Sequence, residues 1–340
     1  MLRVKNLLNL TGDKLHTLPL LVLYITDGCN SRCVSCDIWQ NPRRNMPLQL
    51  AESIAETCAD LGVRWVLLSG GEAMQHPEWD TIAQLFASQG VHVMLLTNGL
   101  LLRKQLDRVI SSVDEVIVSL DGGNAETYEA IRGVDAFDLI FEGIDGLKAA
   151  GMPVTTRTTV QQANFREMPQ IVEVGLAHNV DMISFLAIDV SNPFAFGNRD
   201  TELSPGALSL AETDELSLII DSMNTHFAEY FESGQIVESP QKLNRILVQY
   251  FRALQGEGEF DTPRCNAPHF STVIEVDGRL RPCYFLPSYG RLKPDGERLQ
   301  QAINWNAAQD LRRAYRKGQR KECHTCVCPL YKGPRSLMRM

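Results

Sequence analysis

Three cysteines, Cys29, Cys33 and Cys36, lie within eight residues of one another in the segment YITDGCNSRCVSCDIWQ, directly after an apolar run. Thiolates bind zinc ions and iron–sulfur clusters. A structural zinc site takes four closed ligands, whereas this segment offers three thiols and no histidine. A four-iron cube also usually takes four cysteines, so three thiolates leave one iron open to a ligand that the protein does not supply. The spacing favours an open cluster over zinc.

A second set of cysteines lies near the C-terminus. The segment CNAPHFSTVIEVDGRLRPC has the pattern C-x12-G-x4-C, and CHTCVC follows about 40 residues later. A zinc ribbon and an iron–sulfur cluster both fit such pairs. The members of this set are Cys265, Cys283, Cys323, Cys326 and Cys328.

Composition restricts the class of protein. With 340 residues and 44% hydrophobic composition, the chain can bury one large core, or one large and one small core. The net charge of −8 and the absence of a long basic run disfavour a nucleic-acid partner. No apolar run is long enough to span a bilayer, and the first residues lack the features of a signal peptide. We therefore expect a cytoplasmic protein without a membrane partner, whose cysteines bind metal or take part in catalysis.

The elements that must position the first cysteine set alternate between strands and helices. Six short runs are apolar on both faces, as in parallel strands that helices cover. They lie at 20–26, 65–69, 91–97, 115–120, 153–160 and 182–188. Helical spacing occurs between them at 48–61, 79–88, 103–111, 137–150 and 168–178. Six β/α units are too few for a closed eight-stranded barrel, so the pattern predicts an α/β fold with an open partial (β/α)6 barrel.

The loops with unusual composition all follow strands. DGCNSRCVSC follows the first strand, GGEAMQHP the second, NGL the third and DGG the fourth. Right-handed crossovers place the C-terminal ends of parallel strands at one rim, which is where ligands bind in such folds. We expect these loops to form one site.

The pattern changes after residue 188. A polar connection at 189–206 precedes helical patterns at about 208–231 and 241–254, and the chain from 256 onward is rich in Gly, Pro and Cys. The segment STVIEVDGRLRPC predicts a β-hairpin that turns at Asp277-Gly278. We predict a barrel over 1–188, a helical connection over 189–255 and a small cysteine-rich iron–sulfur region over 256–340.

C-x3-C-x2-C after the first strand, with GGE after the second, resembles the radical S-adenosylmethionine superfamily from Leu20 to about Ile188. The resemblance implies that Cys29, Cys33 and Cys36 hold a [4Fe–4S] cluster whose open iron binds S-adenosylmethionine. It also implies reductive cleavage of this cofactor to a 5′-deoxyadenosyl radical that abstracts hydrogen from a substrate. The electron would come from a donor such as flavodoxin or ferredoxin.

The resemblance also implies contacts to S-adenosylmethionine from the other rim loops. Glu72 would pair with the methionine ammonium group, while Gly70 and Gly71 let backbone approach closely. Family members often contact the ribose or the methionyl carboxylate from the ends of the third and fourth strands. Asn98, Ser119 and Asp121 lie there, although turn chemistry is an alternative explanation for them.

Two further positions concern the cofactor. Arg157, within the strand TTRTTV, is a costly charge in a barrel interior unless it pairs with an anion, which would be the cofactor carboxylate, a substrate or a structural partner. Family members frequently carry an aromatic residue just before the third cysteine, where this chain has Ser35. Adenine contacts would then come from Ile38, Trp39 or the backbone near Leu186.

The C-terminal cysteines are similar to the auxiliary-cluster extension called SPASM, or its shortened twitch form. This implies one auxiliary [4Fe–4S] cluster with Cys265, Cys283, Cys323 and Cys326 as ligands. Cys328 would be a spare ligand, a buried thiol or a hydrogen-atom donor in catalysis.

The spacing of these cysteines resembles that of aminocyclitol dehydrogenases in the family. It favours an oxidoreductase acting on a small polar substrate such as a sugar, an aminocyclitol or a nucleoside. Alcohol oxidation is preferred, and epimerisation or decarboxylation is possible. About 20 residues precede the first strand, which we take as too few for a peptide-recognition domain. A peptide- or protein-modifying maturase is the alternative enzyme, and a metal-binding module without activity is disfavoured.

Overall fold

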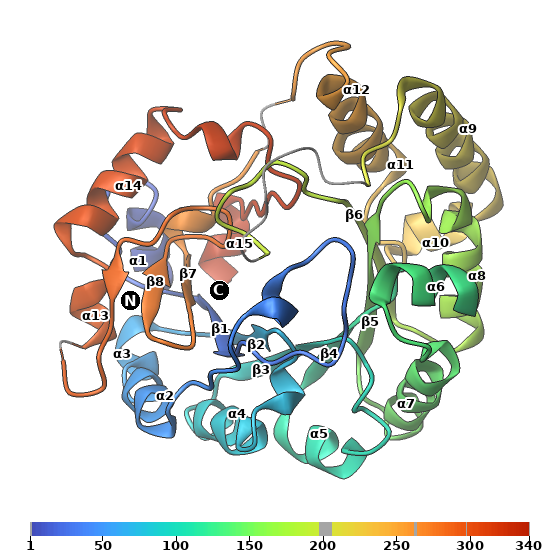
Figure 1. The fold of residues 1–340 in the computed structure, drawn as a ribbon. Helices are drawn as coiled ribbons and strands as arrows, with labels where there is room; N and C mark the ends of the chain where they lie inside the picture. Colours follow the sequence, from blue (N-terminus) through green and yellow to red (C-terminus); the bar gives the residue numbers. More distant parts are fainter. Residues whose placement is uncertain (1, 197–205, 262–263, 297, 340) are drawn as a thin grey trace.

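The computed structural model describes residues 2–196, 206–261, 264–296 and 298–339. All six predicted strands are present, and neighbours pair in parallel in the order β6-β5-β4-β3-β2-β1. They curve into an arc with helices outside, and the arc does not close (Figure 1). This confirms the open partial barrel. The strands are β1 (Leu20–Thr26), β2 (Trp65–Gly70), β3 (His92–Thr97), β4 (Glu115–Ser119), β5 (Val154–Val160) and β6 (Met182–Ala187).

The sheet packs its convex face against helices that follow the strands. Alternate residues of β1, Leu21, Leu23 and Ile25, are fully buried on that face, while Tyr24 lies on the concave face. The predicted helix at 48–61 is two short helices, and α6 was not predicted. The covering helices are α2 (Leu48–Ala55), α3 (Cys58–Leu61), α4 (Trp79–Ala87), α5 (Leu106–Ser112), α6 (Ala125–Arg132), α7 (Phe137–Ala149) and α8 (Met168–Ala177).

The cysteine-rich region extends the same sheet. Strand β7 (Ser271–Ile274) pairs in parallel with β1, and β8 (Arg279–Arg281) and β9 (Gly290–Arg291) continue the sheet with antiparallel pairing. The predicted hairpin turn is confirmed, because Gly278 has φ of 80°, in the left-handed region. The strand that leads into the first cysteine set therefore lies beside the hairpin that leads to Cys283.

Helices beyond the barrel cover its remaining edges. Helix α9 (Leu210–His226), α10 (Ala228–Ser233), α11 (Pro240–Leu243) and α12 (Tyr250–Leu254), with a π-helical turn at Asn244–Gln249, occupy the predicted helical connection. Helices α1 (Leu2–Leu8), α13 (Leu299–Ala302), α14 (Asn306–Arg316) and α15 (Pro334–Arg339) were not predicted. Helices α1 and α15 pack together, with Asn6 Nδ2 donating to the Leu337 carbonyl at 2.8 Å (Figure 1).

Within the predicted connection at 189–206, residues 197–205 lie outside the described residues. The domain boundaries after 188 and 255 stay predictions. Among the described helices, none combines the length and apolar character needed to cross a membrane.

Candidate functional site

The first cysteine set lies on the loop between β1 and α2, inside the arc of strands (Figure 1). Cys29, Cys33 and Cys36 are all partly exposed. Backbone hydrogen bonds fasten the middle of the loop to the end of α6, from Arg32 N to Arg132 O at 2.9 Å and from Val34 N to the Ile131 carbonyl at 3.0 Å. The three thiols are therefore presented by one anchored segment.

Gly70 and Gly71 hold this loop against β2. Gly71 N donates to Thr26 O at 2.8 Å, and Glu72 N donates to Gly28 O at 2.7 Å. A Cβ on Gly70, whose φ is 137°, would meet Thr26 O at 2.3 Å, and one on Gly71 would meet Gly28 O at 2.5 Å. The glycines do permit close backbone approach, and in this structure the approaching backbone is that of the cysteine loop.

The Glu72 carboxylate is 1% exposed and accepts three hydrogen bonds. Its Oε1 accepts from Met74 N at 3.1 Å and from Thr97 Oγ1 at 2.8 Å, and its Oε2 accepts from Asn98 N at 2.7 Å. Burial raises the pKa of this carboxyl, while these donors act in the opposite direction. A carboxylate offers about four acceptor positions, so the described residues leave about one of them open.

Asn98 braces the cysteine loop from the end of β3. Its Nδ2 donates to Asn30 Oδ1 at 2.8 Å and to Ser31 Oγ at 2.9 Å. These contacts give Asn98 a tertiary role that a simple turn would not require.

Ser119, Arg157 and Leu186 lie on three neighbouring strands. Ser119 pairs with Arg157 across β4 and β5, and Leu186 pairs with Thr159 across β5 and β6. Within the described part of the chain, no ion pair involves Arg157, and its Nε is buried without a hydrogen-bond partner. A structural salt bridge therefore does not explain this charge among the described residues.

Asp121 is occupied by protein groups, one of which the sequence analysis missed. Its Oδ2 lies 2.7 Å from Arg132 Nη2, and its Oδ1 accepts from Thr159 N at 2.7 Å. Arg132, at the end of α6, also donates from Nη1 to Cys33 Sγ at 3.7 Å. Burial is the largest single influence on the pKa of Arg132 and lowers it, but Asp121, Cys33 and Tyr128 together raise this pKa above its usual value, so the guanidinium stays charged.

The surroundings of the thiols fit a bound cluster. Besides the donation from Arg132, Ser31 N donates to Cys29 Sγ at 3.5 Å, and hydrogen bonds to sulfur are one determinant of cluster potentials. Burial raises the pKa of Cys29 to about 11, so cluster binding must displace a proton from this thiol. No group of three or more His, Cys, Asp or Glu side chains in the described ranges is arranged to hold a single metal ion.

In the second set, Cys283 lies two residues after β8, at the end of the β7–β8 hairpin. Burial raises the pKa of Cys283, and the neighbouring Cys265, Cys328 and Cys323 raise it further. The pKa of Cys326 is raised first by burial and then by Cys283 and Cys328. These electrostatic effects place the five cysteines, Cys328 included, in one region of the fold.

Comparison with known proteins agrees with this geometry. Residues 23–174 match the model of the Radical SAM superfamily. The chain is 31% identical over 194 residues to an AdoMet-dependent heme synthase of Methanosarcina barkeri, covering 55% of each chain. It is 29% identical over 172 residues to a GTP 3′,8-cyclase of Chlorobaculum tepidum, covering 48% of this chain and 52% of the relative. The chain thus spans about half the length of these relatives.

Solved structures share the fold over most of the chain. Streptococcus suis SuiB bound to S-adenosylmethionine has a TM-score of 0.67 at 15% identity, covering 99% of this chain and 81% of SuiB. The structure of anSMEcpe with bound AdoMet has a TM-score of 0.64 at 17% identity, covering 92% and 89% of the two chains. The residues that match the Radical SAM superfamily model, 23–174, include the three-cysteine loop and strands β2 to β5 of the open parallel sheet.

Proposed function

We propose that Cys29, Cys33 and Cys36 hold a [4Fe–4S] cluster with one open iron, and that the protein binds S-adenosylmethionine there. The observation that carries this proposal is the anchored loop. Three partly exposed thiols share one segment, and charged and backbone donors point at two of their sulfurs. When bound, such a cluster supplies the electron that cleaves S-adenosylmethionine.

The chain's own residues would position both groups. Glu72 and Asn98 hold the rim loops together, and the remaining acceptor position of Glu72 suits the methionine ammonium. Arg157, which has no carboxylate partner among the described residues, is suited to an anion such as the methionine carboxylate. Ser119 and Leu186 lie on the adjoining strands, where they would contact the nucleoside.

The second set of thiols would hold an auxiliary [4Fe–4S] cluster. Cys265, Cys283, Cys323 and Cys326 are the proposed ligands, and the electrostatic effects that these thiols have on one another support a shared metal group. Cys328 belongs to the same cluster of thiols and is exposed, which suits a replacement ligand or a donor to substrate.

For the substrate we favour a small polar molecule, with alcohol oxidation as the reaction. A cavity of about 370 Å³ opens beside Gly70 and Ile38, which is within the range of small-molecule sites. Two relatives are named as a heme synthase and a GTP 3′,8-cyclase. Peptide modification is the competing function, since one solved neighbour is SuiB bound to the precursor peptide SuiA.

The test is anaerobic reconstitution with iron and sulfide, followed by reduction in the presence of S-adenosylmethionine. We expect 5′-deoxyadenosine from the wild type and none from Cys33→Ala, because the cube then has too few protein ligands. Cys58→Ala is the matched control, since that thiol is buried in the core and belongs to neither set. A Cys33→Ala protein that forms 5′-deoxyadenosine at the wild-type rate would reject the proposal.

A further inference from the structure

The cavity beside the cysteine loop has walls from three parts of the chain. Gly70 and Ile38 place it against the loops of the first cysteine set, and Tyr284, which follows Cys283, places it against the second. The segment 189–196 supplies the third wall and is fastened to both sides. Asp37 N donates to Phe196 O at 2.8 Å, and Phe196 N donates to the Tyr284 hydroxyl at 2.7 Å.

One wall of this cavity is aromatic. The rings of Tyr24 and Tyr284 meet edge to face at 5.2 Å, and Phe196 meets Tyr284 at the same distance. Phe194 also lines the cavity. These ring faces suit the apolar or ring-shaped body of a ligand.

The opposite side is charged, and its charges do not balance. Three arginines line the cavity, and the lining carboxylates are two. The arginines are Arg44, Arg279 and Arg281, and the carboxylates are Asp27 and Glu275. Asp277 and Arg291 do not line the cavity, but Asp277 pairs with Arg44 and with Arg291. When both are counted, four arginines still face three carboxylates.

Each lining carboxylate is already engaged. Glu275 bridges two guanidinium groups, with Oε1 2.5 Å from Arg281 Nε and Oε2 2.8 Å from Arg279 Nη2. Asp27 lies 2.7 Å from Arg44 Nη2. Arg281 Nη1 also donates to the Phe194 carbonyl at 2.7 Å, and Arg279 Nε donates to Asp277 Oδ1 at 3.1 Å, so both guanidinium groups are held in place beside the cavity. The two arginines occupy alternate positions of β8 and so share one face of the hairpin.

We infer that this cavity binds a small molecule carrying an oxyanion, a carboxylate or a phosphate, with its body against the aromatic wall. An anion supplies the charge that the lining lacks, and a planar oxyanion matches the donors of a guanidinium group. The inference rests on the proposed function, because it names the substrate class for the same site. Arg279 and Arg281 fix the anionic end, and Arg44 faces it from the cysteine loop.

The test measures binding of simple probes to the reconstituted protein with S-adenosylmethionine present, by calorimetry at fixed ionic strength. Benzoate and phenyl phosphate represent the two oxyanions, and benzamide is the neutral counterpart. We expect either anion to bind at least ten-fold tighter than benzamide, and the tighter of the two identifies the group. Arg279→Gln and Arg44→Gln should each weaken anion binding about ten-fold, and Arg279→Lys should retain part of it.

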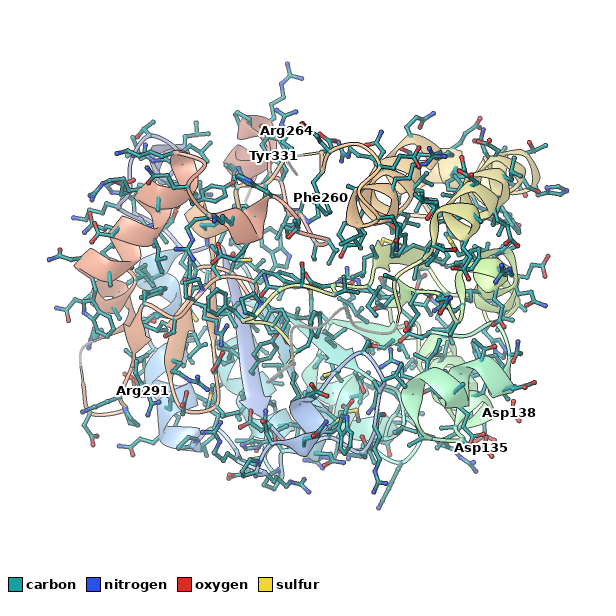
Figure 2. The ribbon with its side chains drawn as sticks, turned by 45° about the horizontal axis from the view of Figure 1, so that its top comes forward. Asp135, Asp138, Phe260, Arg264, Arg291 and Tyr331 are labelled. Carbon is teal, nitrogen blue, oxygen red and sulfur yellow. The ribbon has the colours of Figure 1, made fainter. Side chains whose placement is uncertain are left out.

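Arg291→Gln is the matched control. Arg291 carries the same charge and also pairs with Asp277, at 2.8 Å, but it does not line the cavity and lies at the outer edge of the molecule (Figure 2). The Arg291→Gln protein should bind both anions with the affinity of the wild type. Equal losses in Arg291→Gln and Arg279→Gln would show a long-range charge effect and overturn the site.

Other results also decide the matter. Benzamide binding as tightly as both anions, or an acidic hexapeptide binding more tightly than either, would overturn the assignment to a small oxyanion. Anion binding without 5′-deoxyadenosine formation would keep the subsite and reject the proposed reaction. Formation of 5′-deoxyadenosine without anion binding would keep the proposed reaction and reject the anion subsite.

Discussion

At the scale of single residues, Arg132 connects three features that the sequence separates. Its guanidinium pairs with the buried Asp121 and donates to Cys33 Sγ. Its backbone carbonyl accepts a hydrogen bond from Arg32 N in the cysteine loop. A buried guanidinium with these contacts fixes the loop and keeps positive charge beside the Cys33 sulfur. This is the role that a site for an anionic cluster requires.

We predict that Arg132→Gln lowers the free energy of unfolding by about 3–5 kcal/mol, because it leaves the Asp121 carboxylate buried without its cation. The double variant Arg132→Gln with Asp121→Asn should recover part of this loss, since no charge is then unpaired. Chemical denaturation of both proteins checks the expectation. Equal destabilisation of the two proteins would contradict a buried ion pair.

Individual site residues differ in how far the sequence could specify them. The three cysteines and the GGE segment stand out in the sequence because their spacing resembles that of a known superfamily, and their binding roles stay predictions. Arg132 was missed, although Asn124 and Gly133 mark the ends of its helix as a cap and a left-handed terminus. The engagement of Glu72 by Thr97 depends on which strands become neighbours, and local pattern does not contain that information.

At the scale of elements, the contact between β2 and the cysteine loop depends on glycine. Gly70→Ala places a Cβ 2.3 Å from Thr26 O at a φ of 137°. Backbone strain and overpacking together should lower the free energy of unfolding by about 2–5 kcal/mol. They should also displace the loop and so reduce iron incorporation.

Gly90→Ala is the control for that substitution. Gly90 also has positive φ, of 72°, but a Cβ there meets no atom within 4 Å. The Gly90→Ala substitution should lower the free energy of unfolding by about 1–2 kcal/mol and leave the iron content unchanged. Thermal unfolding and iron analysis compare the two variants, and equal iron content in both would reject a role for Gly70 in holding the loop.

The strands were predictable because parallel strands under helices are apolar on both faces. Helix α14 was not predictable in this way, because its inward face includes a charged residue. Arg312 is 0% exposed and donates to the carbonyls of Asp13 and Ile303. A search for apolar periodicity does not count arginine as a core residue. The pairing of β7 with β1 joins distant segments, which no local pattern specifies.

At the scale of the whole molecule, a buried histidine joins the N-terminal segment to the C-terminal region. His269 is 3% exposed, and its Nδ1 lies 3.0 Å from the Asn9 carbonyl. Burial lowers the pKa of His269 to about 4, and the nearby Arg312 and Arg316 act in the same direction. The folded protein therefore binds this proton more weakly than the unfolded chain does.

The sign of the pH effect follows from that difference. The stabilisation associated with neutral His269 is fully present above about pH 6.5 and is lost as the pH falls toward 4, by up to about 3 kcal/mol. His269→Asn keeps a donor for Asn9 but does not titrate there. Denaturation at several pH values should give a shallower loss for the variant, and parallel curves would show that His269 does not contribute.

The auxiliary region offers a second test at this scale. With two four-iron cubes the wild type should hold about eight irons, and Cys265→Ala should lose about half of them. Because the first set lies on another loop, this variant should still form 5′-deoxyadenosine. Stoichiometric zinc with about four irons in the wild type would reject the auxiliary cluster.

The central claim is that three cysteines leave one iron open for S-adenosylmethionine. Electron–nuclear double resonance on the reduced protein, with S-adenosylmethionine carrying ¹⁵N at its amino group, measures this directly. We predict a ¹⁵N hyperfine coupling to the cluster in the wild type and in Cys265→Ala, which lacks the auxiliary site. A reduced four-iron signal from the first cysteine set without any ¹⁵N coupling would contradict the account.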